Sequence, residues 1–163
     1  MAVINKGDIL LPYGNPTAVG QVLTSTGTGA GDIDWKGFVG LNDFRLTLTT
    51  ATPVTTADVS AAGTIYMTPY KGNQISLYTG SAWVVVTLSE LSVAASTTAT
   101  KVFDIFLDYN AGTPQLVTTD WTDDTNRATA LTYQDGVLVQ TGNVDWRYLG
   151  TARTKTASQV DDA

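Results

Sequence analysis

The sequence contains no cysteine and no histidine among its 163 residues. Without cysteine no disulfide can form, so stability must come from packing and assembly. The absence of both residue types also removes thiolate and imidazole metal ligands, and with them Ser-His-Asp and Cys-His catalysis. The sequence therefore predicts a protein that is not an enzyme and that holds no cofactor and no metal.

Charge is scarce as well. Charged residues make up 15% of the chain and hydrophobic residues 43%, whereas a typical soluble domain is roughly 25% charged. This balance argues against disorder and indicates that a partner covers part of the surface, because interface cores are depleted of charge. The net charge of −6 lacks the basic footprint that a phosphate backbone requires, so we expect no nucleic acid partner.

Long apolar runs are missing too. The longest run, Ala82–Val86, is far shorter than a membrane span. The first residues lack the apolar segment of a signal peptide. We therefore expect a protein that is made in the cytosol and has no membrane partner.

The residues that are present favour strands and turns. Threonine and aspartate are abundant, whereas glutamate occurs once, at Glu90. Threonine suits a half-buried pleated surface, aspartate suits turns, and good helix formers are few. The composition predicts an all-β fold, an antiparallel β-sandwich or small barrel with one short helix, preceded by an extended glycine-rich N-terminal arm.

Residues 1–40 form this predicted arm. Glycines crowd into it and large side chains are few, so it cannot bury a core of its own. Val22 and Leu23 are expected to lie in a strand that enters a glycine turn, and Ile33 and Trp35 begin the next strand. We expect the arm to anchor and trimerise the protein through its apolar side chains, which are Ile9, Leu10, Leu11, Val22, Leu23 and Trp35.

Residues 41–153 are predicted to form the β-domain, because apolar and polar residues alternate from Phe44 onward. The one helix is expected over Trp121–Leu131, with Thr122 as its cap and two aspartates in its first turn. A polar tail over 154–163 is expected to be loose. Strands are predicted at 44–48, 64–68, 75–78, 83–88, 101–109, 116–117, 136–140 and 145–151, with 83–88 buried on both faces and 53–62 a polar loop.

Two groups of carboxylates could in principle form a catalytic pair or a Ca²⁺ site. Asp104 and Asp108 would lie on one face of a strand roughly 13 Å apart, beyond the spacing of a glycosidase pair, so we predict a solvated face. For a Ca²⁺ site the sequence offers Asp32, Asp34, Asp120, Asp123 and Asp124. The EF-hand spacing is absent, so turn formation and helix capping are favoured.

Aromatic residues are spread over the domain. They could stack on sugar rings, but aromatics also fill cores and interfaces. We favour a core or trimer-interface role and keep glycan binding as the alternative. The residues concerned are Tyr66, Tyr70, Tyr78, Trp83, Trp121 and Trp146.

The stretch from about residue 44 to 151 resembles a β-rich domain of tailed-phage surface proteins, found in tail fibres, spikes and head decoration proteins. The segment Gly20–Gly27 resembles the short glycine-rich units of phage fibres, which wrap around a trimer axis. The residues that carry the domain resemblance are Tyr66–Asn73, Ile75–Trp83, Ser89–Ser92, Trp121, Arg127–Leu131, Gln134–Val139 and Arg147–Thr151.

This resemblance implies a homotrimeric structural protein of the virion, docked on a major capsid protein or a tail protein. Capsid decoration is slightly favoured because the chain is short and no distal domain follows Thr151. The alternative is a tail-fibre or spike component that binds a host receptor or surface glycan.

Overall fold

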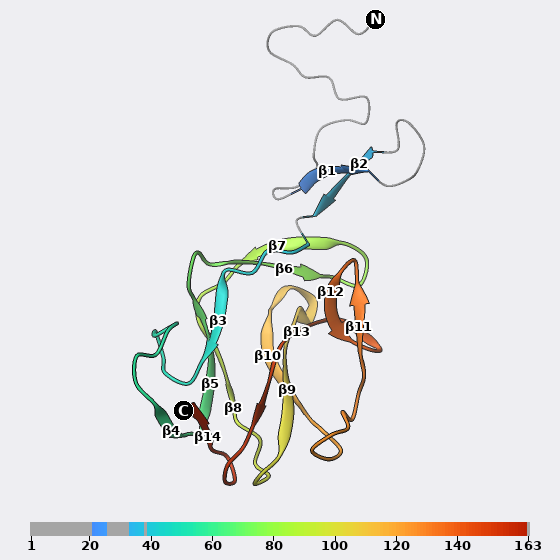
Figure 1. Cartoon of the computed structure of the whole chain (residues 1–163). Helices are drawn as coiled ribbons and strands as arrows, with labels where there is room; N and C mark the ends of the chain where they lie inside the picture. Colours follow the sequence, from blue (N-terminus) through green and yellow to red (C-terminus); the bar gives the residue numbers. More distant parts are fainter. Residues whose placement is uncertain (1–20, 26–32, 38, 163) are drawn as a thin grey trace, which may run out of the picture.

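Strands make up nearly all of the regular structure (Figure 1). The computed structural model describes residues 21–25, 33–37 and 39–162, and within them the remaining regular element is a 3-10 turn at Asn110–Gly112. All strand pairings are antiparallel. The predicted all-β antiparallel fold is therefore confirmed.

A five-stranded sheet forms one layer of the domain. Its strand β9, which has a neighbour on each side, alternates as predicted, with Phe103, Ile105 and Leu107 on the core side. The sheet curls strongly, because Gln140 on β12 donates a hydrogen bond to Thr119 on β10 although two strands lie between them. In spatial order the strands are β10 (Gln115–Asp120), β9 (Val102–Asp108), β13 (Asn143–Arg153), β12 (Val137–Gln140) and β11 (Leu131–Gln134).

A three-stranded sheet forms the facing layer, and the main core lies between the two. Its strands are β3 (Phe44–Thr47), β5 (Thr64–Pro69) and β8 (Leu91–Ala94). Among the residues whose burial is described, the buried apolar side chains of this core are Phe44, Ile65, Met67, Ile75, Leu77, Ala95, Phe103, Ile105, Leu107, Leu116 and Val160.

Two further two-stranded sheets complete the domain. The hairpin of β6 (Gln74–Tyr78) and β7 (Trp83–Thr87) lies across one end of the two layers (Figure 1). Its strand β7 is half-buried along most of its length, so the prediction that residues 83–88 are buried on both faces is wrong. The cause is that β7 pairs only with β6 among the described strands, at the margin of the domain.

The C-terminal segment is part of the fold. Strand β14 (Val160–Asp162) pairs with β4 (Val59–Ala62), and Val160 and Thr154 are buried. The Thr154 hydroxyl donates to the Thr98 carbonyl and accepts from the Lys101 amide. The expectations of a loose tail after residue 153 and of a strandless loop over 53–62 are therefore wrong, because these two segments satisfy each other's backbone groups.

The predicted helix over Trp121–Leu131 is also wrong, because this segment is a loop. The Asp123 carboxylate accepts hydrogen bonds from the backbone amides of Thr125 and Asn126 and from both of their side chains. Aspartate and asparagine offer the backbone such local bonds in competition with a helix. Here the local hydrogen bonds are formed in place of helical ones, and the segment is a loop that connects β10 to β11.

Two strands of the predicted arm pair with each other. Strand β1 (Gln21–Ser25) and strand β2 (Ile33–Gly37) form an antiparallel hairpin, as the sequence predicted. This hairpin lies next to β7 at one end of the domain (Figure 1). In its register Leu23 is opposite Trp35, while Ile9, Leu10 and Leu11 lie outside the described residues.

Candidate functional site

The six predicted aromatics do not form one patch. Tyr78 and Trp83 meet at the tip of the β6–β7 hairpin, with ring centroids 5.4 Å apart. Trp146 packs against Phe106 on the five-stranded sheet, and Trp121 follows β10 in the long loop. Tyr66 and Tyr70 belong to the other layer. All but Tyr70 are half-buried, which supports packing roles for most of them.

The inner side of the curled sheet holds a buried acid. Asp104 is only 2% exposed, so the predicted solvated face is wrong. Its carboxylate accepts from the Arg127 Nε at 2.8 Å and from the hydroxyl of Thr151. Thr151 Oγ1 lies 2.7 Å from the Tyr148 hydroxyl. The curl of the sheet and the loop that carries Arg127 together bury this acid, which a single strand's alternation does not reveal.

Arg127 also stacks on aromatic rings. Its guanidinium carbon lies 4.4 Å from the centre of the Trp121 ring and 5.8 Å from that of Tyr148. Cations placed over aromatic faces are attracted by the ring quadrupole. The Trp121 indole N–H is buried without a partner among the described residues. Arg127 therefore fastens the 121–130 loop onto the sheet, and this cluster is a packing device.

Asp108 is buried as well, and its contacts are local. It accepts from the backbone amide of Asn110 at 2.8 Å and from the side-chain amide of Gln115 at 3.1 Å. Asp104 and Asp108 thus have separate partners, and their carboxylates brace a turn and a loop. This arrangement gives neither acid the role of a paired acid and nucleophile.

The acids weighed for Ca²⁺ also face different partners. Asp120 accepts from the Ser96 hydroxyl, and Asp124 pairs with Arg153 at 2.9 Å. Hydrogen bonds from Asn126 and Thr125 hold the pKa of Asp123 well below its usual range. Within the described residues no three acidic side chains gather as metal ligands, whereas Asp32 and Asp34 lie in or beside the undescribed turn.

A buried cation joins the five-stranded sheet to strand β6 of the β6–β7 hairpin. Arg147 on β13 donates to the carbonyls of Leu41 and Ser76, at 2.9 and 2.6 Å. Burial lowers the pKa of Arg147 to about 10. Its donors therefore satisfy backbone acceptors inside the protein and are not available to an external ligand.

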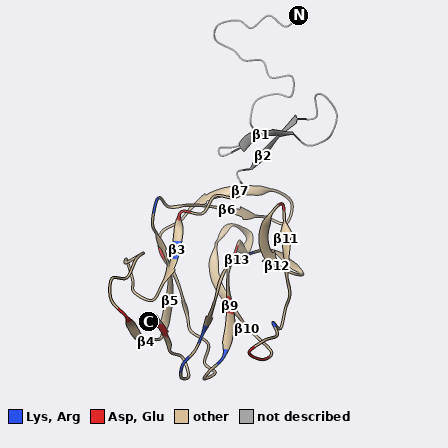
Figure 2. Ribbon diagram, viewed as in Figure 1, with Lys and Arg blue, Asp and Glu red and all other residues tan. Residues whose placement is uncertain are grey.

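Tyr70 is the one aromatic of the predicted six that lies open to solvent, at 41% exposure. The Arg45 guanidinium carbon lies 4.0 Å from the centre of its ring, and the Lys71 ammonium lies 5.9 Å from the same centre. In Figure 2 these basic positions mark β3 and the loop between β5 and β6. We refer to Arg45, Tyr70 and Lys71 as the basic cluster.

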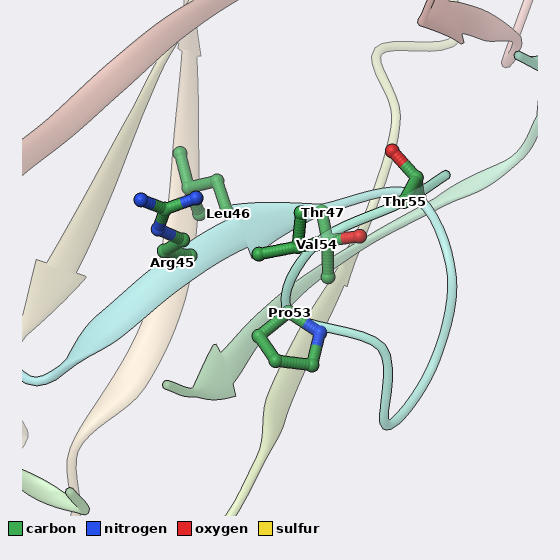
Figure 3. A pocket seen from close by; sticks show the side chains of 6 residues that line it. All are labelled: Arg45, Leu46, Thr47, Pro53, Val54 and Thr55. Atoms are coloured by element: carbon green, nitrogen blue, oxygen red, sulfur yellow. The ribbon is translucent and has the colours of Figure 1, made fainter. Parts of the chain in front are cut away.

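An open hollow of about 310 Å³ adjoins this cluster, along β3, which is an edge strand of its sheet. Figure 3 shows the loop of Pro53, Val54 and Thr55 running beside Thr47 on β3. Val54 is 46% exposed, so the wall offers an apolar surface to solvent. The lining residues are Arg45, Leu46, Thr47, Pro53, Val54 and Thr55.

Glu90, the single glutamate, holds the start of that loop. Its carboxylate accepts from the Thr50 hydroxyl at 2.6 Å, from the Ala51 amide at 2.7 Å and from the Thr68 hydroxyl. Ala51 has a φ of 54°, in the left-handed region that costs a non-glycine residue free energy. Glu90 therefore ties a strained turn to β5 and fixes one wall of the hollow.

This contact predicts an acid-sensitive loop. The hydroxyls of Thr50 and Thr68 lower the pKa of Glu90 from its ordinary value of 4.5. A lowered folded-state pKa gives stability that is present above pH 4.5 and is lost as the pH falls through the folded value. We expect Glu90→Gln to lower the free energy of unfolding at pH 7 and the difference from wild type to shrink toward zero near pH 2. Urea titrations across this range test it; a difference that does not change with pH would contradict it.

Comparison with protein families, with curated proteins and with solved structures finds no match for this chain. Across the residues that the structure describes, no helix has the length and apolar character needed to cross a bilayer.

Sequence reasoning identified the aromatics but missed their cationic partners. Arg45 and Arg127 have no distinctive spacing from their rings in the sequence, because strand pairing and the loop bring them there, whereas Lys71 directly follows Tyr70. Glu90 could have been singled out, since it is the one glutamate of the chain.

Proposed function

We propose that the chain is a non-enzymatic structural protein of a tailed-phage virion, a homotrimeric capsid decoration protein whose β-domain is displayed on the particle surface. The N-terminal arm anchors it to another virion protein. The proposal takes its class from the resemblance of residues 44–151 and of Gly20–Gly27 to phage surface proteins. It is also supported by the way in which the domain uses its buried polar groups, as follows.

One observation supports a display role above others: the domain uses its buried polar groups for its own cohesion. Asp104, Asp108 and Arg147 all bond within the domain, and the main core, as far as burial is described, lies within residues 44–160. The β1–β2 hairpin pairs with itself at one end. Such a division fits a self-contained unit carried by a separate attachment segment.

Trimerisation is assigned to the arm for a physical reason. Among the described residues, the large apolar side chains that are exposed are Val54, Tyr70 and Tyr133. Stable subunit interfaces bury roughly 800 Å² per partner around an apolar core. Three side chains fall short of that, so we assign the trimer contact to the arm.

The mass of the purified chain tests the assembly. We expect light scattering to give about three times 17.3 kDa at micromolar concentration. The trimer should resist moderate salt, since charged groups are few and apolar contacts are weakly screened. A monomer under these conditions would contradict trimerisation by the arm alone.

Imaging of phage particles tests the location. Purified particles labelled with an antibody against the domain should carry label over the head. Label at the tail would support the alternative, a tail-fibre or spike component, for which the exposed Tyr70 beside two cations is the favouring observation. Absence of the chain from purified particles would overturn both assignments.

A further inference from the structure

Two cations of the domain are not engaged by any acceptor among the described residues. Five of the basic side chains donate to a carboxylate or a carbonyl: Lys101, Arg127, Arg147, Arg153 and Lys155. Arg45 and Lys71 instead lie over the ring of Tyr70, and among the described residues neither donates to a carboxylate or a carbonyl. In a chain with a net charge of −6, these two side chains form a local positive patch whose N–H donors are not hydrogen-bonded within the described structure.

The ring of Tyr70 holds the Arg45 guanidinium in place. A guanidinium over an aromatic face still has N–H donors to offer, and these match a carboxylate through two parallel hydrogen bonds. Arg45 pairs across the sheet with Thr68 on β5, so its backbone is fixed by strand pairing. Less side-chain freedom is then lost when an anion binds.

The volume and lining of the hollow beside Arg45 indicate the size and polarity of a ligand that it could hold. Its volume of about 310 Å³ lies at the small end of ligand sites, enough for one or two sugar rings. Pro53 and Val54 give it an apolar wall, and Thr47 lies opposite on β3. A sugar ring has an apolar C–H face that suits such a wall, and a uronic or sialic acid adds a carboxylate.

We propose that the basic cluster and the adjoining hollow bind an acidic sugar residue of a surface polysaccharide. Arg45 takes the carboxylate with Lys71 beside it, and Val54 packs against the ring. The inference goes beyond the structural role and is the same whether the domain is mounted on the head or on the tail.

The acids near the cluster accept hydrogen bonds from other residues. The Glu90 carboxylate accepts from Thr50, Ala51 and Thr68. The Asp43 carboxylate accepts from the Gln74 amide at 3.1 Å. Neither forms an ion pair with Arg45 or Lys71 in the described structure, so the incoming carboxylate meets cations whose donors are unpaired.

The experiment is an array of uronic- and sialic-acid oligosaccharides, each beside its methyl ester, probed with the full chain. We expect the acids to bind and the esters, which lack the negative charge and carry one added methyl group, to bind roughly tenfold more weakly or not at all. Arg45→Gln should reduce binding by roughly tenfold, and Val54→Asp should do the same by placing a carboxylate in the hollow. Thermal melting checks that both variants fold.

The matched control is Arg153→Gln, which removes an exposed arginine paired with Asp124 away from the cluster; its binding should equal that of wild type. Equal binding of acids and esters would overturn the proposal, as would full binding by Arg45→Gln. Binding of poly-glutamate without any acidic sugar would overturn it in favour of a peptide partner. Because the assay needs no particles, its failure is separate from failure of the virion assignment.

Discussion

Removal of residues 1–38 is expected to leave a soluble β-rich domain that is monomeric and that no longer joins particles. Among the residues whose burial the structure describes, the main core is built from side chains within residues 44–160, so we expect the domain to fold without the arm. Burial of one Leu or Ile side chain is worth about 1.5–3 kcal/mol. The arm offers Ile9, Leu10, Leu11, Val22, Leu23 and Trp35 in each of three chains, ample for tight attachment.

Circular dichroism, light scattering and occupancy on purified particles measure the three parts of this prediction. Occupancy should fall to background, and the mass should fall to that of one truncated chain. Asp58→Asn is the matched control, since this exposed residue lies in the domain, and its occupancy should be unchanged. Full incorporation of the truncated chain would place the anchor in the domain, and failure to fold would make the arm part of the core.

Phe106→Ala is expected to lower the free energy of unfolding by about 3–5 kcal/mol. Phe106 is fully buried, and its ring centroid lies 6.0 Å from that of Trp146 and 5.9 Å from that of Tyr148. The substitution leaves a cavity under both rings, on the side of the sheet that also holds Asp104. A domain is stable by only about 5–15 kcal/mol, so the loss is a large share of the total.

Equilibrium unfolding in urea, followed by circular dichroism, gives the number. Phe106→Leu should cost less than about 1.5 kcal/mol, because it retains most of the volume. Tyr133→Ala is the exposed control, since Tyr133 is 70% exposed; its effect should stay within about 0.5 kcal/mol. A loss below about 1 kcal/mol in Phe106→Ala would mean that the inner side of the curled sheet contributes little to the fold.

Much of the fold could be predicted because strand signals are local. Alternation along 101–109 predicts β9, and the strands predicted at 75–78 and 83–88 are present as the paired β6 and β7. The prediction of a helix over 121–131 was wrong because one side chain, Asp123, accepts hydrogen bonds from the local backbone and holds it in a loop. The pairing of β4 with β14 was not predicted, because no local sequence pattern indicates a contact between residues about 100 positions apart.

The basic cluster was only partly accessible from the sequence. Tyr70 belonged to the aromatic set, but Arg45 lies 25 positions earlier. Register decides the contact: Phe44 is opposite Pro69 and Arg45 is opposite Thr68, which brings the long arginine side chain to the ring at the end of β5. The burial of Asp104 was missed for a related reason, since a curled sheet has two covered sides and simple alternation assumes one.

The pairing of β4 with β14 has a consequence for synthesis on the ribosome. The Ala61 amide donates to the Asp161 carboxylate, 100 positions later, and translation proceeds at roughly 5–20 residues per second. Strand β4 therefore waits about 5–20 s after leaving the ribosome before its partner exists. During that interval it is an open strand edge that a neighbouring nascent chain can occupy. Slow production at low temperature, with few ribosomes per message, should therefore raise the yield of correctly closed domain.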